Sequence, residues 1–556
     1  MLADRQPALW TSVMVIALLV AIGITFGAAR DGGFVSLDDG NNIFLHPQLG
    51  TLTWDRVLWA WSDFSSARRY LPLGWLGFSA VVSAQGYHPA GFHLACIGWH
   101  ALAAVALLGA SRQILRRFAA PAAQGWADAL AWLATAAWAL HPLRAEVTAW
   151  ASGLLYAQAS ALALVALWLW TLRWSASRGP NWLATGSLIA FLGSLLTYPI
   201  ALGLPVVCWI LDRSPGNGRA ETTPASIRSV RQTGGIWVLL FVAASGLVLA
   251  ANLAARGQKP EEFARMAPWS DFGIADRLLQ ALYVWGRYLQ QWIWPAQPSP
   301  VYTDLFDLSA PSAKVVATAW AAAALLAAGL WIARRHRLIL GSLLAYSAMA
   351  LPFLGLLEHP WVAHDRYASL LSPVLGIAVA AGLLRVRTAA WRVTVVVAAG
   401  GLIIIGAAHA RSLAGHWRDE QAFDARLRAT LPRQAAAGYY LGYLPSSAHF
   451  LAGRFDAIMP TLAQAERDAP GWSADSTRDE FRRLVQQHEE FVARNWPGTT
   501  VPPRAVLHLL HGLAAMDRGD TQTARAHWEA ALAVAPGFTP AAQALASSDG
   551  TTTRRR

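Results

Sequence analysis

Two adjacent carboxylates, Asp38 and Asp39, follow the first long apolar segment of the chain, within FVSLDDGNNIFLHP. Adjacent carboxylates repel one another, so at least one of them holds a proton more tightly and makes a stronger general base. Beyond an apolar helix they would lie at a membrane surface, within reach of a substrate that is half lipid. The alternative is a solvated turn or a helix N-cap, because Asp and Asn favour both positions.

A third acid, Glu146, lies in ALHPLRAEVTAW, shortly after His141 and Pro142 end another apolar segment. On the same side of a membrane as Asp38, it could hold a cation, an acceptor group or a sugar hydroxyl. A lone glutamate in a short loop is otherwise an ordinary solvated side chain.

Two histidines, His93 and His100, are seven residues apart in GYHPAGFHLACIGWH and therefore share one face of a helix. A metal site would need three or four ligands, with Asp38 or Glu146 added to the histidines. Histidines in apolar helices more often hydrogen-bond to a neighbouring helix. We therefore assign no metal site, although the acids are compatible with a divalent cation.

Cationic candidates lie in two places. The segment EHPWVAHDRYASLLSP puts His364, Asp365 and Arg366 just before an apolar run. The guanidinium fork suits phosphate, so Arg366 could hold the phosphate of a lipid carrier, or else anchor the helix by pairing with Asp365. Arg68 and Arg69 are a second candidate contact for a phosphate or an acceptor.

The composition indicates that these residues are positioned by membrane helices. The 556 residues are 55% hydrophobic and 14% charged, whereas ordinary globular domains carry roughly 25% charged residues. The 28 tryptophans and the net charge of +12 suit lipid headgroups and give no reason to expect a nucleic-acid partner. Two cysteines imply no disulfide framework. About eleven segments approach the length of a span: 9–29, 89–110, 127–142, 153–172, 182–197, 199–211, 236–255, 313–333, 338–357, 367–386 and 391–409.

Basic residues alternate between the connecting loops and predict the orientation. The arginine-rich loops share one side, which the positive-inside rule makes cytoplasmic together with the N-terminus. The loops that hold Asp38, Glu146 and Arg366 then lie outside. Residues 274–295 are long enough to span but carry many polar residues, so we expect an amphipathic helix at the outer interface.

Two domains and a tail are expected. Residues 1–409 form the membrane domain, whose long first outer loop, 30–88, carries interfacial helices. Residues 410–546 regain charge and form an extracytoplasmic helical domain. Small residues, a tryptophan and a proline at 505–538 fall at tetratricopeptide-repeat positions, and 448–471 is a looser match. The alternative is a plain helical hairpin. Residues 547–556 are expected to be disordered.

These motifs, taken in order, resemble the polytopic GT-C class of glycosyltransferases that use polyprenyl-phosphate sugars. More narrowly, the chain is similar to the tetratricopeptide-bearing protein O-mannosyltransferases (the TMTC family) and their bacterial relatives. The resemblance rests on LDDGNNIFLHP, RRYLPLGWLGFSAVVSAQGYHPAGFHLACIGWH, HPLRAE, HDRYASLLSP and the terminal repeats. It departs from the family at Leu37, where an aromatic residue is frequent, and at His46, where an Asn is frequent.

The resemblance implies an all-α fold and an inverting transferase. Asp38 would be the general base, Arg366 would meet the departing phosphate, and Glu146 matches an acid of the second outer loop. The expected residues are catalytic Asp38, Asp39 and Glu146; donor phosphate-binding Arg366, Arg68 and Arg69; and substrate-binding His93, His141, His364 and Asp365.

The expected donor is a polyprenyl-phosphate hexose such as mannose, and the expected acceptor is a Ser or Thr hydroxyl of a protein outside the membrane. In a bacterium this would be the plasma (inner) membrane. The same donor chemistry could serve lipid A, a glycolipid or a cell-wall polymer. A non-catalytic scaffold that recruits partners through the repeats is another reading. A transporter would be expected to place its acids near the bilayer midplane.

Overall fold

The computed structural model describes residues 5–66, 69–175, 181–216, 224–257, 273–296, 298–305, 311–356 and 363–552. Within these ranges the regular structure is entirely helical, and no strand occurs. The expectation of an all-α fold is therefore confirmed.

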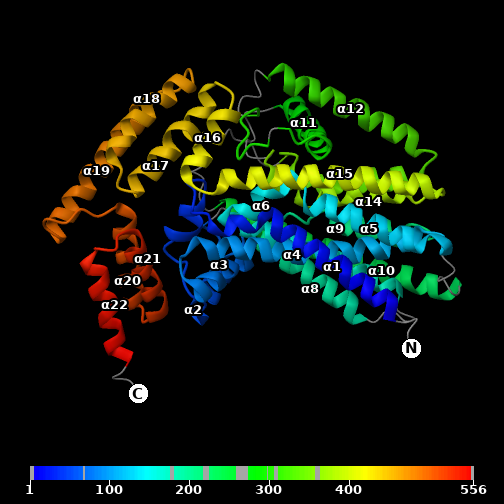
Figure 1. Ribbon diagram of the computed structural model, residues 1–556, viewed down its shortest axis with the longest axis horizontal. Coiled ribbons are helices and arrows are strands. Elements are labelled where there is room, and N and C mark those ends of the chain that lie inside the picture. Colours follow the sequence, from blue (N-terminus) through cyan, green and yellow to red (C-terminus); the bar gives the residue numbers. More distant parts are fainter. Residues whose placement is uncertain are drawn as a thin grey trace.

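Long apolar helices form the N-terminal bundle and run roughly parallel to one another (Figure 1). α4 packs along α7, and α7 packs on α8, so α7 lies at the centre of the bundle. The helices of this part are α1 (Arg5–Phe26), α2 (Trp54–Ser62), α3 (Pro72–Gln85), α4 (Pro89–Phe118), α5 (Gln124–Ala139), α6 (Ala145–Ala149), α7 (Leu154–Leu172), α8 (Asn181–Thr197), α9 (Leu204–Arg213), α10 (Pro224–Gly257), α11 (Ile274–Ile293), α12 (Ala313–Ala333), α13 (Arg337–Ala350), α14 (Ser372–Leu383) and α15 (Ala389–Ala414).

Seven helical segments of the described chain are long and apolar enough to cross a bilayer. They are Thr11–Asp31, Pro89–Phe118, Ala151–Leu172, Gly234–Gly257, Ala313–Ala333, Asp365–Leu383 and Ala389–Trp417. Large apolar side chains such as Ile16, Leu239, Trp320 and Ile404 are exposed on them, as lipid-facing residues are. These features are those of a multi-pass membrane protein.

The other four segments expected to span form shorter helices. α5 has 16 residues, α8 has 17, α9 has 10 and α13 has 14. A helix rises 1.5 Å per residue, so these helices fall short of the roughly 20 residues that an upright span requires.

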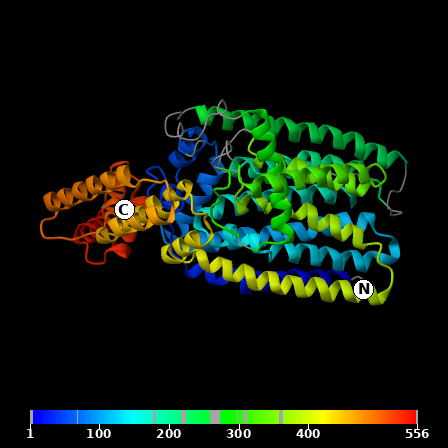
Figure 2. The same ribbon diagram turned by 90° about the horizontal axis from the view of Figure 1, so that it is seen from above.

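Helix α11 is amphipathic, but its polar side faces the protein. Arg277, Gln280 and Arg287 are buried, and Gln280 Nε2 donates to the Gly355 carbonyl at 2.8 Å. The apolar Ile274 is 81% exposed instead. The helix runs across the bundle rather than along it (Figure 2), and it is not among the seven candidate spans.

The segment between α1 and α4 contains the helices α2 and α3, as expected for the first outer loop, and two short helical turns. These turns are η1 (Gly27–Asp31) and the π-helix η2 (Gly40–Phe44), with the aspartate pair between them. Trp54 on α2 is 73% exposed, which suits an interfacial position.

The C-terminal helices lie at one end of the bundle, and the N-terminus lies at the other (Figures 1 and 2). They are α16 (Glu420–Thr430), α17 (Leu444–Leu451), α18 (Ile458–Asp468), α19 (Asp475–Asn495), α20 (Pro503–Asp517), α21 (Thr521–Val534) and α22 (Thr539–Thr552). α20 and α21 form a closely packed hairpin in which Gly512 lies against the Trp528 indole, where a Cβ would overlap.

The expected tail differs from the structure. Residues 547–552 belong to α22, and residues 553–556 lie outside the described ranges. Arg525 Nη1 on α21 donates to Ser548 Oγ at 2.9 Å, and this contact holds the helix end against the hairpin.

Candidate active site

Asp38 has an unusual backbone conformation. Its φ is +61°, and it is the one non-glycine residue of the described chain with a positive φ. The left-handed region costs an ordinary residue about 1–2 kcal/mol. Such residues persist where the surroundings enforce them, and they concentrate at functional sites. The Asp38 side chain is exposed, whereas its neighbour Asp39 is buried.

Asp39 holds this turn in place. Its Oδ1 accepts hydrogen bonds from Ser152 N at 2.9 Å and Ser152 Oγ at 2.6 Å, and its Oδ2 accepts from Val35 N at 2.9 Å. The Trp150 indole donates to the Leu37 carbonyl at 3.0 Å. Burial raises the pKa of Asp39 to about 7, although these hydrogen bonds oppose the shift. Asp39 therefore positions the turn, and Asp38 is left facing the solvent.

Asp38 lies among cations. The surrounding protein raises the pKa of its carboxyl, while the charges of Arg366 and then Arg69 lower it. The carboxyl is exposed, but enough protein surrounds it to disfavour its charged form. A raised pKa brings an aspartate closer to the strength that a general base needs.

Arg366 forms a buried ion pair with Glu146. Its Nη1 lies 2.5 Å from Glu146 Oε1, and its backbone N–H donates to Oε2 at 2.9 Å. Aromatic rings surround the guanidinium, with centroids 5.2 Å away for Trp150, 5.5 Å for Tyr156 and 5.4 Å for Tyr367. Cation–π contacts of this kind fix the position of a guanidinium in a desolvated site.

Arg69 approaches the same site from the segment between α1 and α4. Its guanidinium lies 5.2 Å from the Tyr198 ring, and that ring lies 4.5 Å from Tyr156. Tyr156 in turn flanks Arg366, so both cations belong to one aromatic cluster. The structure thus brings Asp38, Glu146, Arg366 and Arg69 together.

Behind the ion pair lies a second carboxylate with further arginines. Asp365 Oδ2 accepts from the Tyr302 hydroxyl at 2.8 Å, and the Arg287 guanidinium lies 3.8 Å from the Tyr302 ring. Arg144 is 1% exposed, and none of its three guanidinium nitrogens has a hydrogen-bond partner in the described chain. Its positive charge is offset by Asp365 and Glu146.

This cluster has an excess of positive charge. The buried cations Arg144, Arg287 and Arg366 outnumber the buried carboxylates Glu146 and Asp365, although Asp38 also acts on Arg366 and Asp304 on Arg287. The guanidinium N–H groups of Arg144 have no acceptor in the described chain, and an anionic ligand could supply one. The site is therefore suited to a phosphate.

Two of the three predicted histidines lie within hydrogen-bond distance of backbone carbonyl groups. His93 Nε2 lies 3.1 Å from the Gly33 carbonyl, and His141 Nε2 lies 3.1 Å from the Trp292 carbonyl. His364 is buried, with its ring 6.0 Å from the Tyr367 ring. Arg68 lies outside the described residues. Among the residues that the structure does describe, no group of three or more His, Cys, Asp or Glu side chains could hold a metal ion.

Sequence reasoning missed Arg287 and Tyr302, and it did not assign Arg144 a role in the site. Arg287 belongs to a polar stripe on α11 that includes Arg277, Gln280 and Tyr283, spaced by three or four residues. This spacing was the sequence signal that could have identified Arg287. The sequence predicts an amphipathic helix at the outer interface, whereas in the structure the polar side of α11 faces the protein.

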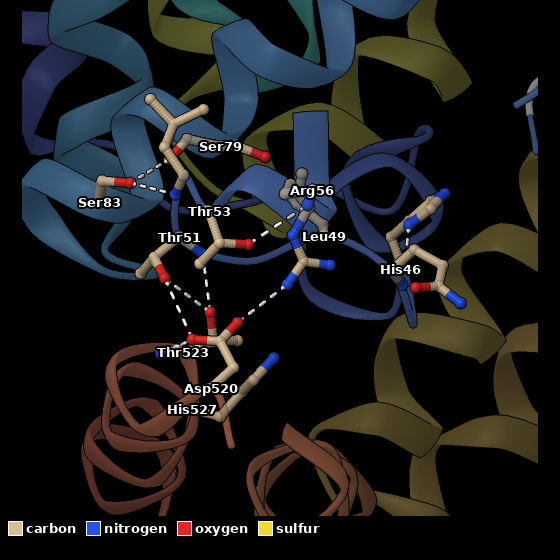
Figure 3. Close-up of polar contacts among 12 residues, drawn as sticks. His46, Leu49, Thr51, Thr53, Arg56, Ser79, Ser83, Asp520, Thr523 and His527 are labelled. Carbon is tan, nitrogen blue, oxygen red and sulfur yellow. Dashed lines mark hydrogen bonds and ion pairs between the residues drawn. The ribbon is translucent and has the colours of Figure 1, made fainter. Parts of the chain in front are cut away.

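The C-terminal hairpin α20–α21 docks directly beside the aspartate turn. Thr51 N donates to Thr523 Oγ1 at 2.8 Å, and Arg56 Nη2 lies 3.2 Å from Asp520 Oδ2. Figure 3 shows Asp520 and Thr523 of the hairpin pointing toward Thr51 and Arg56, in the segment between α1 and α4. Arg56 is buried, so its half of this ion pair is shielded from solvent.

Arg504, from α20, reaches the turn itself. Its guanidinium lies 4.0 Å from the Phe44 ring and 5.2 Å from the Phe34 ring. Phe34 precedes the aspartate pair and Phe44 ends η2, and the two rings lie 5.3 Å apart. The carboxylate of Asp39 is near enough to act on Arg504, so the C-terminal helices help to hold the segment that contains Asp38.

No family model, curated protein or solved structure matches this chain.

The hairpin contact should weaken in acid. His508 Nδ1 lies 3.0 Å from His527 Nδ1, and His527 Nε2 lies 2.9 Å from the Tyr87 hydroxyl. Tyr87 donates to the Leu49 carbonyl at 2.9 Å. Burial lowers the pKa of both histidines well below the ordinary value of 6.5, and the facing groups His511, Arg56, Arg504 and Arg518 lower it further.

Both histidines are held neutral when the hairpin is docked. Protonation therefore favours the undocked state, but only at a pH low enough to protonate an exposed histidine. Docking should therefore be unaffected above pH 6.5 and should weaken below it, by up to about tenfold per histidine at pH 5.5. Limited proteolysis of the α19–α20 connection at pH 7.5 and at pH 5.5 measures the change in docking. His508→Asn should reduce the pH effect, and His336→Gln, at an exposed histidine beside α13, is the control. Equal proteolysis at pH 7.5 and 5.5 would contradict the prediction.

The contribution of Glu146 to the free energy of unfolding should depend on the presence of Arg366. Glu146→Leu leaves a further buried guanidinium unbalanced and should cost about 3–5 kcal/mol, whereas the double variant with Arg366→Met should recover most of that loss. Thermal unfolding of the detergent-purified protein measures both. Additive losses would show that the two side chains do not depend on one another.

Proposed function

We propose that this protein is a membrane-embedded inverting glycosyltransferase. It moves a sugar, a hexose such as mannose, from a polyprenyl-phosphate carrier to an acceptor hydroxyl on the extracytoplasmic face. The observation that carries the proposal is Asp38: an exposed carboxylate held in a strained backbone conformation, close enough to Arg366 and Arg69 for their charges to act on it.

In the proposed reaction, the carboxylate of Asp38 and the guanidinium groups of the arginines act on opposite sides of the sugar. The acceptor oxygen attacks the anomeric carbon while its proton passes to the Asp38 carboxylate. The bond between that carbon and the phosphate oxygen breaks, and the phosphate leaves with the electron pair. Arg366 and Arg69 meet the negative charge that develops on it, which lowers the barrier. Attack opposite the leaving group inverts the anomeric configuration.

An apolar groove supports a lipid-linked donor. It has a volume of about 110 Å³ and is lined by residues of several bundle helices, including Leu164, Leu204, Met349, Leu370 and Ile377. The lining includes Leu370, four residues after Arg366, and extends to Phe118 at the end of α4 and Arg337 at the start of α13. A polyprenyl chain fits such a lining, because burial of hydrocarbon is favourable there.

We propose the finer topology on the same grounds. Eleven crossings would include α5, α8, α9 and α13 in addition to the seven candidate spans. Both numbers are odd, so in either case the N-terminus and the C-terminal helices lie on opposite sides of the membrane. We assign the N-terminus to the cytoplasm, because the arginines of the loops at that end follow the positive-inside rule.

The acceptor is proposed to be a Ser or Thr hydroxyl of a polypeptide. The hairpin α20–α21, with Gly512 against Trp528, is proposed to be a tetratricopeptide repeat. A short array offers little concave surface, so the acceptor would be held close to the site rather than along the repeats. Lipid A, a glycolipid or a cell-wall polymer would use the same donor chemistry. Mass spectrometry of envelope proteins and lipids, with and without the protein, distinguishes these acceptors.

Asp38→Asn should abolish transfer without unfolding the protein. The amide cannot take the acceptor proton, and loss of a general base typically costs roughly 10²–10⁴-fold in rate. Purified protein assayed with a panel of polyprenyl-phosphate sugars measures this, and Asp31→Asn, at an exposed acid of the same segment, is the control. Because the pKa of Asp38 is raised, activity should be lost on acidification at a higher pH than an ordinary aspartate would give. Full activity of the Asn variant would exclude Asp38 as the base and leave a scaffold role open.

Cysteine labelling should place the aspartate turn and the hairpin on one side. The native Cys96 and Cys208 are buried, so introduced cysteines report on position. In intact cells, a membrane-impermeant thiol reagent should label Ser65→Cys and Gln543→Cys, and should label Arg335→Cys only after permeabilisation. All three residues are exposed in the structure. Labelling of 65 and 543 from opposite sides would end the proposal.

A further inference from the structure

The segment Tyr439–Tyr443 forms an aromatic shelf between α16 and α17. Tyr439 is 46% exposed, and its ring lies nearly parallel to that of Tyr443, at 5.2 Å and 11°. Tyr440 meets Tyr439 edge to face, at 5.2 Å and 89°, and is 1% exposed. An exposed ring supported on two sides by other rings has a fixed orientation, so it can receive a flat ligand without ordering itself first.

The backbone beneath the shelf is tightly fitted. Tyr439–Tyr443 is a π-helix, a rare conformation that is frequent at functional sites. Gly438 and Gly442 lie directly on the Trp472 indole, where any Cβ would overlap it. Arg428 Nη2 donates to the Leu441 carbonyl at 3.1 Å, which fixes the segment from the other side.

The shelf lies beside Asp38. Glu420, at the start of α16, accepts from Ser36 N at 2.6 Å and Ser36 Oγ at 2.7 Å, two residues before Asp38, and α16 packs on the π-helix. The Asp38 carboxylate is close enough for its charge to act on Tyr439 and Tyr440. Burial, Tyr443 and then Asp38 raise the pKa of Tyr439 to about 12, so this phenol stays neutral at physiological pH.

We propose that Tyr439 and Tyr443 form the acceptor subsite, on which an extended polypeptide segment lies while its Ser or Thr hydroxyl reaches Asp38. This inference rests on the proposed function and adds the chemistry of the acceptor. The flat face of the shelf suits a prolyl ring or another compact apolar side chain next to the modified residue.

The surrounding polar groups favour a peptide over a sugar acceptor. The Tyr443 hydroxyl donates to Glu480 Oε1 at 3.2 Å, and Arg428 is paired with Asp424 and Asp468. A sugar displays many hydroxyls and needs converging polar partners, but these groups are already engaged with one another. Consecutive rings on a track suit an extended chain, as in the aromatic grooves that bind polyproline II segments.

Acceptor kinetics test this inference. Tyr439→Ala and Tyr439→Leu should raise the KM for a Ser/Thr peptide with a neighbouring proline by roughly tenfold or more, which corresponds to loss of one aromatic anchor. Tyr439→Phe should retain the wild-type KM, because the ring remains. Phe491→Ala, which removes an exposed ring of α19, is the matched control and should leave both the peptide KM and the hydrolysis of the donor by water unchanged.

The outcomes separate the two proposals. If the wild-type protein neither hydrolyses nor transfers from any polyprenyl-phosphate sugar, the proposed function fails. If it transfers to peptides but Tyr439→Ala and Tyr439→Leu leave the KM unchanged, the shelf is not the acceptor subsite. If only glycolipid acceptors work and their KM depends on Tyr439, the shelf binds sugar and the peptide assignment is overturned. A proline-independent KM that still rises in Tyr439→Ala would remove the preference for a neighbouring ring.

Discussion

The Glu146–Arg366 ion pair is the interaction on which the candidate site depends. Both side chains are buried, and each carboxylate oxygen accepts a hydrogen bond from Arg366, one from the side chain and one from the backbone. The pair therefore fixes the guanidinium and the start of the Asp365–Leu383 segment to the short helix α6. α6 is followed by Trp150 and Ser152, which hold the aspartate turn. A single buried ion pair thus sets the distance between the cation and the candidate base.

The two adjacent aspartates have different roles because their environments differ. Asp39 is buried and accepts three hydrogen bonds, so it fixes the conformation of the turn. Asp38 is exposed and faces cations. Paired acids with separated environments are a common basis for assigning acid–base roles. The strain at Asp38 is borne by its neighbours: the bonds of Asp39, the indole of Trp150 and the docked hairpin, through Arg504, all restrict the same turn.

Much of this site could be anticipated from the sequence, because chemistry-bearing residues stood next to apolar segments whose alternation sets their side of the membrane. Asp38, Glu146, Arg366 and Arg69 were singled out in this way, and the structure brings them together. The left-handed backbone of Asp38 could not be anticipated, because only the surrounding tertiary contacts impose it. The direction of α11 was also hidden: a polar stripe has the same periodicity whether water or protein lies against it. Arg287 escaped for that reason. α9 and α13 are shorter than the apolar segments expected there, because hydropathy alone does not show where a helix ends.

The excess positive charge of the buried cluster has a consequence for the proposed reaction. A phosphodiester donor carries one negative charge, and the polyprenyl phosphate that leaves carries up to two. The same arginines that meet the charge developing in the transition state therefore also bind the product more tightly than the substrate. Glu146 and Asp365 moderate this effect, because each offsets part of the cationic charge. The two acids are then as necessary for release of the carrier as the arginines are for breaking its bond to the sugar. An uncompensated arginine cluster would hold the spent lipid in the site.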